Sequence, residues 1–130
     1  IILNGVTVLV STPYMDEAER CNQVSILYEG KILTTGAPRE LEDELPFEIL
    51  EVKARPRKVI REVVAATEGV LSWRPVGDRL RLSVNGLESI QARLASALED
   101  AGAEISILRR SKPTMEDVFI HMVEDQRSLT

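Results

Sequence analysis

Two hydroxyl side chains and two carboxylates follow an apolar run near the start of the sequence. Residues 6–10 read Val-Thr-Val-Leu-Val, Ser11 and Thr12 come next, and Asp16 and Glu17 follow shortly after. A wholly apolar strand that ends in hydroxyl residues and passes into an acidic helix is typical of a doubly wound α/β sheet, which binds ligands at the carboxyl ends of its strands. The pattern therefore predicts one wall of a nucleotide site.

Each of these groups also has a purely structural interpretation. Ser11 and Thr12 either offer hydroxyls to a phosphate or simply end the strand, and the sequence leaves both interpretations open. Asp16 and Glu17 look at first like metal ligands. Acidic residues in the first turn of a helix are expected from the helix dipole alone, which is worth about 0.3–1 kcal/mol for each. We therefore predict no metal site there.

Residues 5–45 closely resemble the segment that follows the catalytic core in ATP-binding cassette (ABC) transporter ATPases. In that family a strand ends in Ser-Thr-His, and a helix of the type Met-Asp-Glu-Ala-Glu follows, as at residues 15–19 here. Two closing strands and a short helix come next, and residues 24–33 and 36–41 continue the chain in the same way. The resemblance implies that this segment ends a nucleotide-binding domain.

The family's switch histidine, which contacts the γ-phosphate, corresponds to Pro13 in this chain. Proline neither donates a hydrogen bond nor transfers a proton, so this role does not carry over and no catalytic residue is assigned. The resemblance implies that Ser11, Thr12 and Pro13 lie near the γ-phosphate of ATP in the parent protein. We expect that site to be modified but still able to bind nucleotide.

Several motifs of a working ATPase do not occur in the sequence. There is no Gly-x-x-x-x-Gly-Lys-Ser/Thr loop (Walker A) to surround the β- and γ-phosphates. The family's Leu-Ser-Gly-Gly-Gln signature and the Asp-Glu pair (Walker B) that holds magnesium are absent too. We therefore expect a C-terminal fragment of an ATPase that is not catalytic alone. ATP and magnesium would be cofactors of the parent, and none is expected for the fragment.

Leu45-Pro46 is predicted to mark a domain boundary, because proline disfavours helical geometry in the residue before it. Before the boundary we expect strands at 6–11, 23–28 and 31–35, with helices at 15–21 and 38–45. Beyond it we expect strands at 47–54, 70–75, 79–84 and 104–110, with helices at 57–67, 87–101 and 115–124.

The predicted fold class is α/β (α+β) with two regions. Residues 1–45 would be the C-terminal remnant of a P-loop NTPase sheet. Residues 46–130 have the order β-α-β-β-α-β, which predicts a ferredoxin-like accessory domain with an extra C-terminal helix.

Turn and cap residues support these elements. Gly30 would supply a positive φ for a tight hairpin, and Pro75-Val76-Gly77-Asp78 would turn the central hairpin of the second region. Gly102 would end the helix before it, and Thr114 with Asp117 would form a capping pair for the last helix.

The phrase Lys-Pro-Thr-Met-Glu-Asp-Val-Phe at residues 112–119 is similar to the last helix of the small domain appended to the ATPase subunits of drug, antibiotic and polysaccharide exporters. This resemblance implies a membrane permease and a second ATPase subunit as partners, with the protein on the cytoplasmic face of the cell membrane. The alternative is a regulatory or subunit-interaction module that senses a ligand or dimerises through a ferredoxin-like domain. The fold alone does not choose between them.

The net charge of −5 lies entirely in residues 1–45, which hold 3 basic and 8 acidic side chains, whereas residues 46–130 hold 13 of each. An acidic chain is a poor candidate for nucleic-acid binding. No apolar run reaches the roughly 18 residues of a membrane span, so we expect a soluble, cytoplasmic protein. We expect a solvated helix face, rather than an anion or lipid-headgroup site, for a local basic cluster that comprises Lys53, Arg55, Arg57, Lys58 and Arg61.

Three single residues and one apolar run complete the sequence-based expectations. Cys21 is expected to be a packing residue, His121 a surface or interface residue, and Trp73 a partly buried core residue. The apolar side chains of residues 6–10 would be covered in a complete sheet by elements that this chain does not contain. We therefore expect the fragment to self-associate.

Overall fold

The chain passes from one structural unit to another at Leu45–Pro46 and returns at Lys112–Pro113 in the computed structural model, which describes residues 5–128. The first unit therefore contains residues 5–45 together with 113–128, and the second contains residues 46–112. The sequence placed the last helix with the second region. Its apolar face instead completes the core of the first unit.

The second unit is a four-stranded antiparallel sheet covered on one face by two helices. Its elements are β3 (Glu48–Arg55), α3 (Arg57–Ala66), β4 (Val70–Val76), β5 (Arg79–Val84), α4 (Leu87–Asp100) and β6 (Glu104–Ser111). The strands lie in the order β4-β5-β3-β6, and each neighbouring pair is antiparallel. The β-α-β-β-α-β order predicted from the sequence is present, and the mixed α and β class is confirmed.

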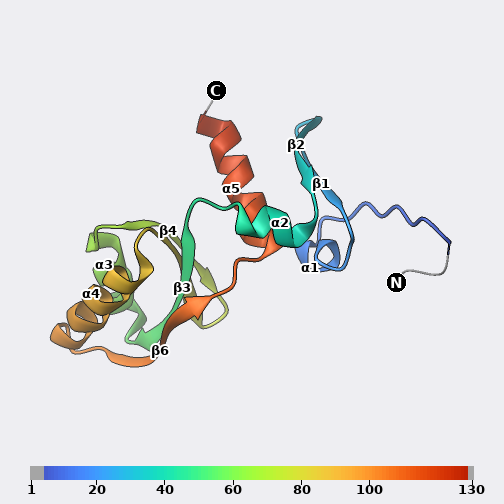
Figure 1. The fold of residues 1–130 in the computed structure, drawn as a ribbon. Helices are drawn as coiled ribbons and strands as arrows, with labels where there is room; N and C mark the ends of the chain where they lie inside the picture. Colours follow the sequence, from blue (N-terminus) through green and yellow to red (C-terminus); the bar gives the residue numbers. More distant parts are fainter. Residues whose placement is uncertain (1–4, 129–130) are drawn as a thin grey trace. The chain divides into compact units, whose positions relative to one another are not determined.

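The core of the second unit forms because alternate residues of its strands are apolar. Leu80, Leu82 and Val84 of β5 are buried, while the residues between them remain partly exposed. They pack beneath the apolar stripes of α3 and α4, which lie side by side in Figure 1. Trp73 of β4 is partly buried against this core, as predicted from the sequence.

In the second unit, one glycine ends a helix and another lies in the turn of a hairpin. Gly102 has a φ of 80° and ends α4 by donating its N–H to the carbonyl of Glu99 at 3.0 Å, as the sequence predicted. The hairpin between β4 and β5 turns at Gly77-Asp78 alone. Pro75, predicted to lie in that turn, is a residue of β4, because an edge strand needs no donor on its open side.

The first unit contains a short hairpin and three helices. Its elements are α1 (Met15–Ala18), β1 (Val24–Tyr28), β2 (Lys31–Gly36), α2 (Pro38–Asp43) and α5 (Met115–Ser128). Glu29 and Gly30 both have positive φ values, 49° and 77°, which a two-residue antiparallel hairpin with the right-handed strand twist requires. The tight hairpin predicted at Gly30 is therefore confirmed.

Helix α5 belongs to the first unit because of the side chains that it buries. Met115 and Val118 form one cluster with Ile26 of β1 and Leu41 of α2, and all four are at most 5% exposed. Figure 1 shows α5 beside α2. Residues 5–45 therefore form this cluster only together with α5, which supplies two of its four buried side chains.

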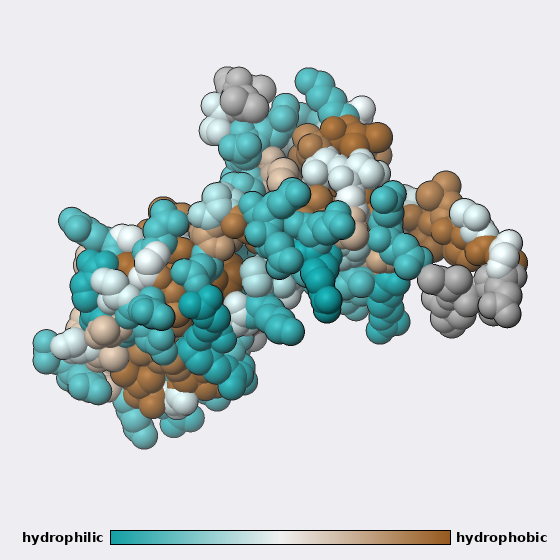
Figure 2. All heavy atoms as spheres, in the orientation of Figure 1, coloured by the Kyte–Doolittle hydropathy of each residue, from teal (hydrophilic) through white to brown (hydrophobic). Residues whose placement is uncertain are grey.

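The predicted strand at 6–11 is wrong for this chain. Residues 6–12 have no regular secondary structure, and Val6, Val8, Leu9 and Val10 are between 52% and 97% exposed. Brown, apolar surface marks the blue segment of Figure 1 in the space-filling view (Figure 2). A strand exists only when a neighbour pairs with it, and no strand among residues 5–128 lies beside this run.

Candidate functional site

The nucleotide-site residues predicted from the sequence lie in an exposed segment that leads into α1. Ser11 and Pro13 are exposed, and Thr12 is half-buried. The Thr12 hydroxyl accepts a hydrogen bond from the backbone N–H of Tyr14 at 3.0 Å, which fixes the chain just before the helix begins. Thr12 thus has a local structural role, and Ser11 carries the more accessible hydroxyl.

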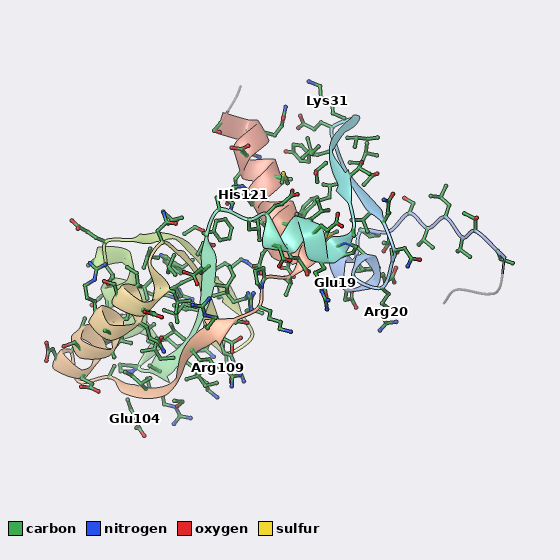
Figure 3. The ribbon with its side chains drawn as sticks, viewed as in Figure 1. Glu19, Arg20, Lys31, Glu104, Arg109 and His121 are labelled. Atoms are coloured by element: carbon green, nitrogen blue, oxygen red, sulfur yellow. The ribbon has the colours of Figure 1, made fainter. Side chains whose placement is uncertain are left out.

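Helix α1 starts at Met15 with Asp16 and Glu17 in its first turn, where the helix dipole favours negative charge. Its following residue, Glu19, extends towards the start of α5. The Glu19 Oε1 atom accepts a hydrogen bond from the backbone N–H of Met115 at 2.9 Å. Figure 3 labels Glu19 beside α1 and α2. Sequence reasoning did not connect these residues, because the contact depends on how α5 docks.

The start of α5 is capped as the sequence predicted. The backbone N–H of Thr114 donates to Asp117 Oδ2 at 2.8 Å, and the N–H of Asp117 donates to the Thr114 hydroxyl oxygen at 3.4 Å. This reciprocal pair is a capping box in which Asp takes the place of the usual Glu. Asp117 is only 6% exposed, so a carboxylate is held inside the first unit next to Glu19 and the start of α5.

A third carboxyl joins this group from α2. Burial, followed by a hydrogen bond to Glu19 and by the negative charges of Glu19, Asp43 and Asp117, raises the pKa of Glu42 to about 7. Below about pH 7, Glu42 therefore carries a proton, through which it forms its hydrogen bond to Glu19. Acidic side chains thus meet where α1, α2 and α5 come together, and the protonation of Glu42 makes this contact sensitive to pH.

The basic residues at positions 53–61 lie on two different elements, β3 and α3, and do not form a single cluster. Arg57, Lys58 and Arg61 of α3, together with Glu62, line a shallow depression of about 370 Å³. Lys53 lies elsewhere and contacts Asp78 Oδ2 at 2.8 Å, and this hydrogen bond lowers the pKa of Asp78. The three exposed cations on α3 agree with the solvated helix face expected from the sequence.

Cys21 and His121, which the sequence analysis also considered, are both half-buried. Cys21 is half-buried just after α1, with its Sγ atom 3.7 Å from the carbonyl oxygen of Glu17. His121 is half-buried on α5, where Figure 3 labels it. Within residues 5–128, no group of three His, Cys, Asp or Glu side chains could hold a metal ion. None of the helices in this part of the chain is long and apolar enough to cross a membrane.

Comparison with known proteins places this fold in a family. Residues 36–123 match the family model described as "ATP-binding protein DrrA1-3-like, C-terminal domain". The chain belongs to this family. The match begins at the end of β2 and runs into α5, so it includes parts of both units.

Individual relatives are similar to this chain, two of them over nearly its whole length. The daunorubicin resistance ATP-binding protein DrrA3 of Streptomyces coeruleorubidus is 27% identical over 98% of this chain and 41% of its own length. A Nod factor export ATP-binding protein I of Burkholderia thailandensis is 31% identical over 94% of this chain and 38% of its own length. The probable multidrug ABC transporter ATP-binding protein YbhF of Escherichia coli is 39% identical over 39% of this chain and 10% of its own.

These relatives confirm the resemblance to ABC ATP-binding subunits that the sequence motifs indicated. The chain spans about two fifths of the length of the daunorubicin and Nod factor proteins that it matches.

Proposed function

We propose that this chain forms the C-terminal part of the ATP-binding subunit of an ABC-type exporter, in which ATP hydrolysis drives transport across the membrane. The supporting observation is that, in a chain of the DrrA1-3-like family, the Ser-Thr segment and the hairpin come before the matched region and lead into its first short helix, in the order that resembles the end of a nucleotide-binding domain. Relatives named as export and drug-resistance ATP-binding proteins align with nearly all of it.

In this proposal the first unit is the end of the nucleotide-binding domain. Residues 6–10 would become a strand in the complete sheet, which accounts for an apolar run that is exposed in the present chain. Helix α5 would pack against that domain, since Met115 and Val118 are buried against Ile26 and Leu41. Residues 46–112 would then be an insertion between two parts of one unit.

The residues present do not suffice to hold ATP or magnesium. Ser11 offers one accessible hydroxyl, Thr12 is engaged with Tyr14, and Pro13 has no donor. Asp16 and Glu17 follow, and residues 5–19 contain no Lys or Arg to balance a triphosphate. We therefore derive no catalytic step from this chain. Its proposed contribution is to support one edge of a site whose phosphate loop and metal ligands lie elsewhere in the parent protein.

The complete subunit would act with a membrane permease and a second ATP-binding subunit, peripherally on the inner face of the cell membrane. The charge distribution does not support nucleic acid as a partner, because the first unit is strongly acidic.

The test measures phosphate release from ATP in the presence of magnesium. It compares residues 1–130 with the complete product of the gene. We expect no turnover from residues 1–130 and turnover from the complete protein. A Pro13→Ala variant of the complete protein should keep most of its activity, because Pro13 donates no proton. Turnover by residues 1–130 that a substitution within them abolishes would contradict the proposal, as would a complete protein that neither binds nor hydrolyses ATP.

A further inference from the structure

The hairpin of β1 and β2 is covered on one of its two faces. Ile26 of β1 is 5% exposed and belongs to the cluster that α2 and α5 complete. Val24 of β1 and Leu33 of β2 are partly buried against the same cluster. Successive residues of a strand point to opposite faces. The residues between these buried positions therefore point away from α2 and α5.

Two cross-strand pairs make up the uncovered face. Ser25 lies opposite Thr35, and Leu27 lies opposite Ile32. Directly opposed residues share one face of a sheet, and residues two apart on a strand share it too. All four side chains are exposed. We call these four residues the outward face of the hairpin.

The outward face of the hairpin is uncharged and largely apolar. Leu27 and Ile32 are 64% and 66% exposed. The hydroxyl oxygens of Ser25 and Thr35 lie 2.9 Å apart and share a hydrogen bond. Figure 2 shows brown, apolar surface beside the hairpin. Because the two hydroxyl groups already bond to each other, a surface that covers this face needs to supply few hydrogen bonds.

The pairing of Leu27 with Ile32 distinguishes them from exposed apolar residues elsewhere. Leu71 and Val76 are also exposed, but they lie near opposite ends of β4, and scattered apolar side chains are common on protein surfaces. In β1 and β2, by contrast, apolar side chains occupy both faces. That pattern is typical of strands that are buried on both faces of an α/β sheet.

The length of the relatives indicates what could cover this face. This chain aligns with 41% of the daunorubicin resistance protein DrrA3 and with 38% of a Nod factor export protein. The family model that it matches is described as a C-terminal domain. Most of the additional chain in such relatives therefore precedes the part that aligns here.

We propose that the outward face of the hairpin packs against the preceding part of the complete subunit, where Leu27 and Ile32 become buried. This packing rests on the proposed function, since it places the hairpin inside a nucleotide-binding domain. It is a different contact from the strand proposed at residues 6–10. A strand pairs through its backbone, whereas Leu27 and Ile32 make contact through their side chains, so the two contacts can be tested separately.

Two other occupants fit the outward face less well. A membrane surface attracts basic side chains through its anionic headgroups, and the four residues of this face carry no charge. A second copy of the chain is apolar enough to cover Leu27 and Ile32. Association of copies follows mass action and depends on concentration, whereas a contact within one polypeptide does not.

The first experiment measures how fast a maleimide labels a thiol on the outward face. Leu27→Cys and Ile32→Cys are made separately with Cys21→Ser, in residues 1–130 and in the complete product of the gene. Mass analysis of the peptide that contains each new thiol gives its labelling rate. We expect labelling at least roughly tenfold slower in the complete product, because burial restricts access to local opening of the structure.

Leu71→Cys with Cys21→Ser is the matched control. Leu71 is also apolar and 54% exposed, but it lies on β4 of the second unit. Its labelling rate should agree within about threefold between residues 1–130 and the complete product. If Leu27→Cys prevents the complete product from folding, Ile32→Cys provides the same measurement from the opposite strand.

The second experiment places a charge on the outward face. Leu27→Asp should lower the thermal unfolding midpoint of the complete product, where the carboxylate would be buried. It should leave the midpoint of residues 1–130 nearly unchanged, because Leu27 is exposed there. Leu71→Asp should have little effect on either protein. A midpoint of the complete product that Leu27→Asp leaves unchanged would overturn the proposed packing.

The labelling results separate this packing from the proposed function. Equal labelling rates in residues 1–130 and in a complete product that hydrolyses ATP would overturn the packing alone. Labelling of residues 1–130 that slows as their concentration rises, to the rate seen in the complete product, would overturn it in favour of a second copy. Slow labelling in a complete product that neither binds nor hydrolyses ATP would support the packing and contradict the proposed function.

Discussion

Glu19 accepts a hydrogen bond from the backbone N–H of Met115 at 2.9 Å, although 96 residues separate the two. The contact joins the end of α1 to the first residue of α5. Because the first N–H groups of a helix have no partner within it, the Glu19 carboxylate satisfies one of them at the positive end of the helix dipole. It thus holds together the two stretches of sequence that make up the first unit.

Removing this carboxylate should therefore weaken the first unit. We expect Glu19→Ala to lower the free energy of unfolding by about 1 kcal/mol, which is typical of a lost N-terminal helix cap. Glu17→Ala is the control, since Glu17 is exposed on the same helix and should change stability by less than about 0.5 kcal/mol. Urea denaturation followed by circular dichroism measures both. Equal effects would mean that the contact with Met115 contributes nothing.

The raised pKa of Glu42 predicts that the first unit is less stable in mild alkali than in mild acid. A carboxyl whose pKa is higher in the folded state than in the unfolded chain contributes its full stability below the unfolded pKa. That contribution is lost as the pH rises through the folded pKa. For Glu42 the window runs from a pKa of 4.5 to about 7. Glu42→Gln should remove the dependence and should be more stable than wild type at about pH 8.

Urea midpoints at about pH 5 and about pH 8 test this prediction. The Gln side chain can still donate a hydrogen bond to Glu19, so the variant keeps the contact and loses only the titration. The exposed neighbour Asp43 provides the control, and Asp43→Asn should leave most of the pH dependence in place. A wild-type midpoint that rises between the two pH values would contradict the assignment.

Cutting the chain after Lys112 should affect the two units differently. Without α5, Ile26 and Leu41 lose the side chains of Met115 and Val118 that cover them, so the first unit should lose its cooperative unfolding. Residues 46–112 keep their complete core, and their transition should persist. Trp73 packs against that core and reports it by fluorescence. The opposite outcome, in which the truncated chain keeps the first unit and loses the tryptophan transition, would refute the division into units.

Gly69 is predicted to be the glycine least tolerant of substitution. Its φ is 93°, and a Cβ atom there would lie 2.3 Å from Cδ1 of Ile90 in the core. We expect Gly69→Ala to destabilise the second unit by about 1–3 kcal/mol through backbone strain and overpacking. Gly77→Ala is the matched control, because Gly77 also has a positive φ, of 62°, but open space around it. Thermal unfolding of both variants should show the larger loss for Gly69.

Most local elements could be predicted because their signals lie within a few residues. The alternation along β5, the Glu29-Gly30 turn and the helix end at Gly102 each depend on neighbouring residues only. The capping pair of Thr114 and Asp117 likewise spans four positions. In each case backbone sterics or a local hydrogen bond decides the structure, and tertiary contacts agree with it.

The remaining features depend on partners far along the sequence. The predicted strand at 6–11 has the right composition but no neighbouring strand among the described residues, and a strand cannot form without one. The position of α5 follows from which apolar faces meet, and the placement of Glu51 opposite Arg109 follows from the register of β3 and β6. A single sequence does not contain that information in local form.

The most direct test of the proposed function is ATP hydrolysis by the complete gene product with Val8→Asp and Val10→Asp. If residues 6–10 become a buried strand in the complete nucleotide-binding domain, two buried carboxylates should abolish magnesium-dependent hydrolysis. Leu71→Asp is the control, because Leu71 is also exposed and apolar, at 54%, but lies on β4 of the second unit. We expect loss of activity for the double variant and near-normal activity for the control. A folded double variant that hydrolyses ATP like wild type would contradict it.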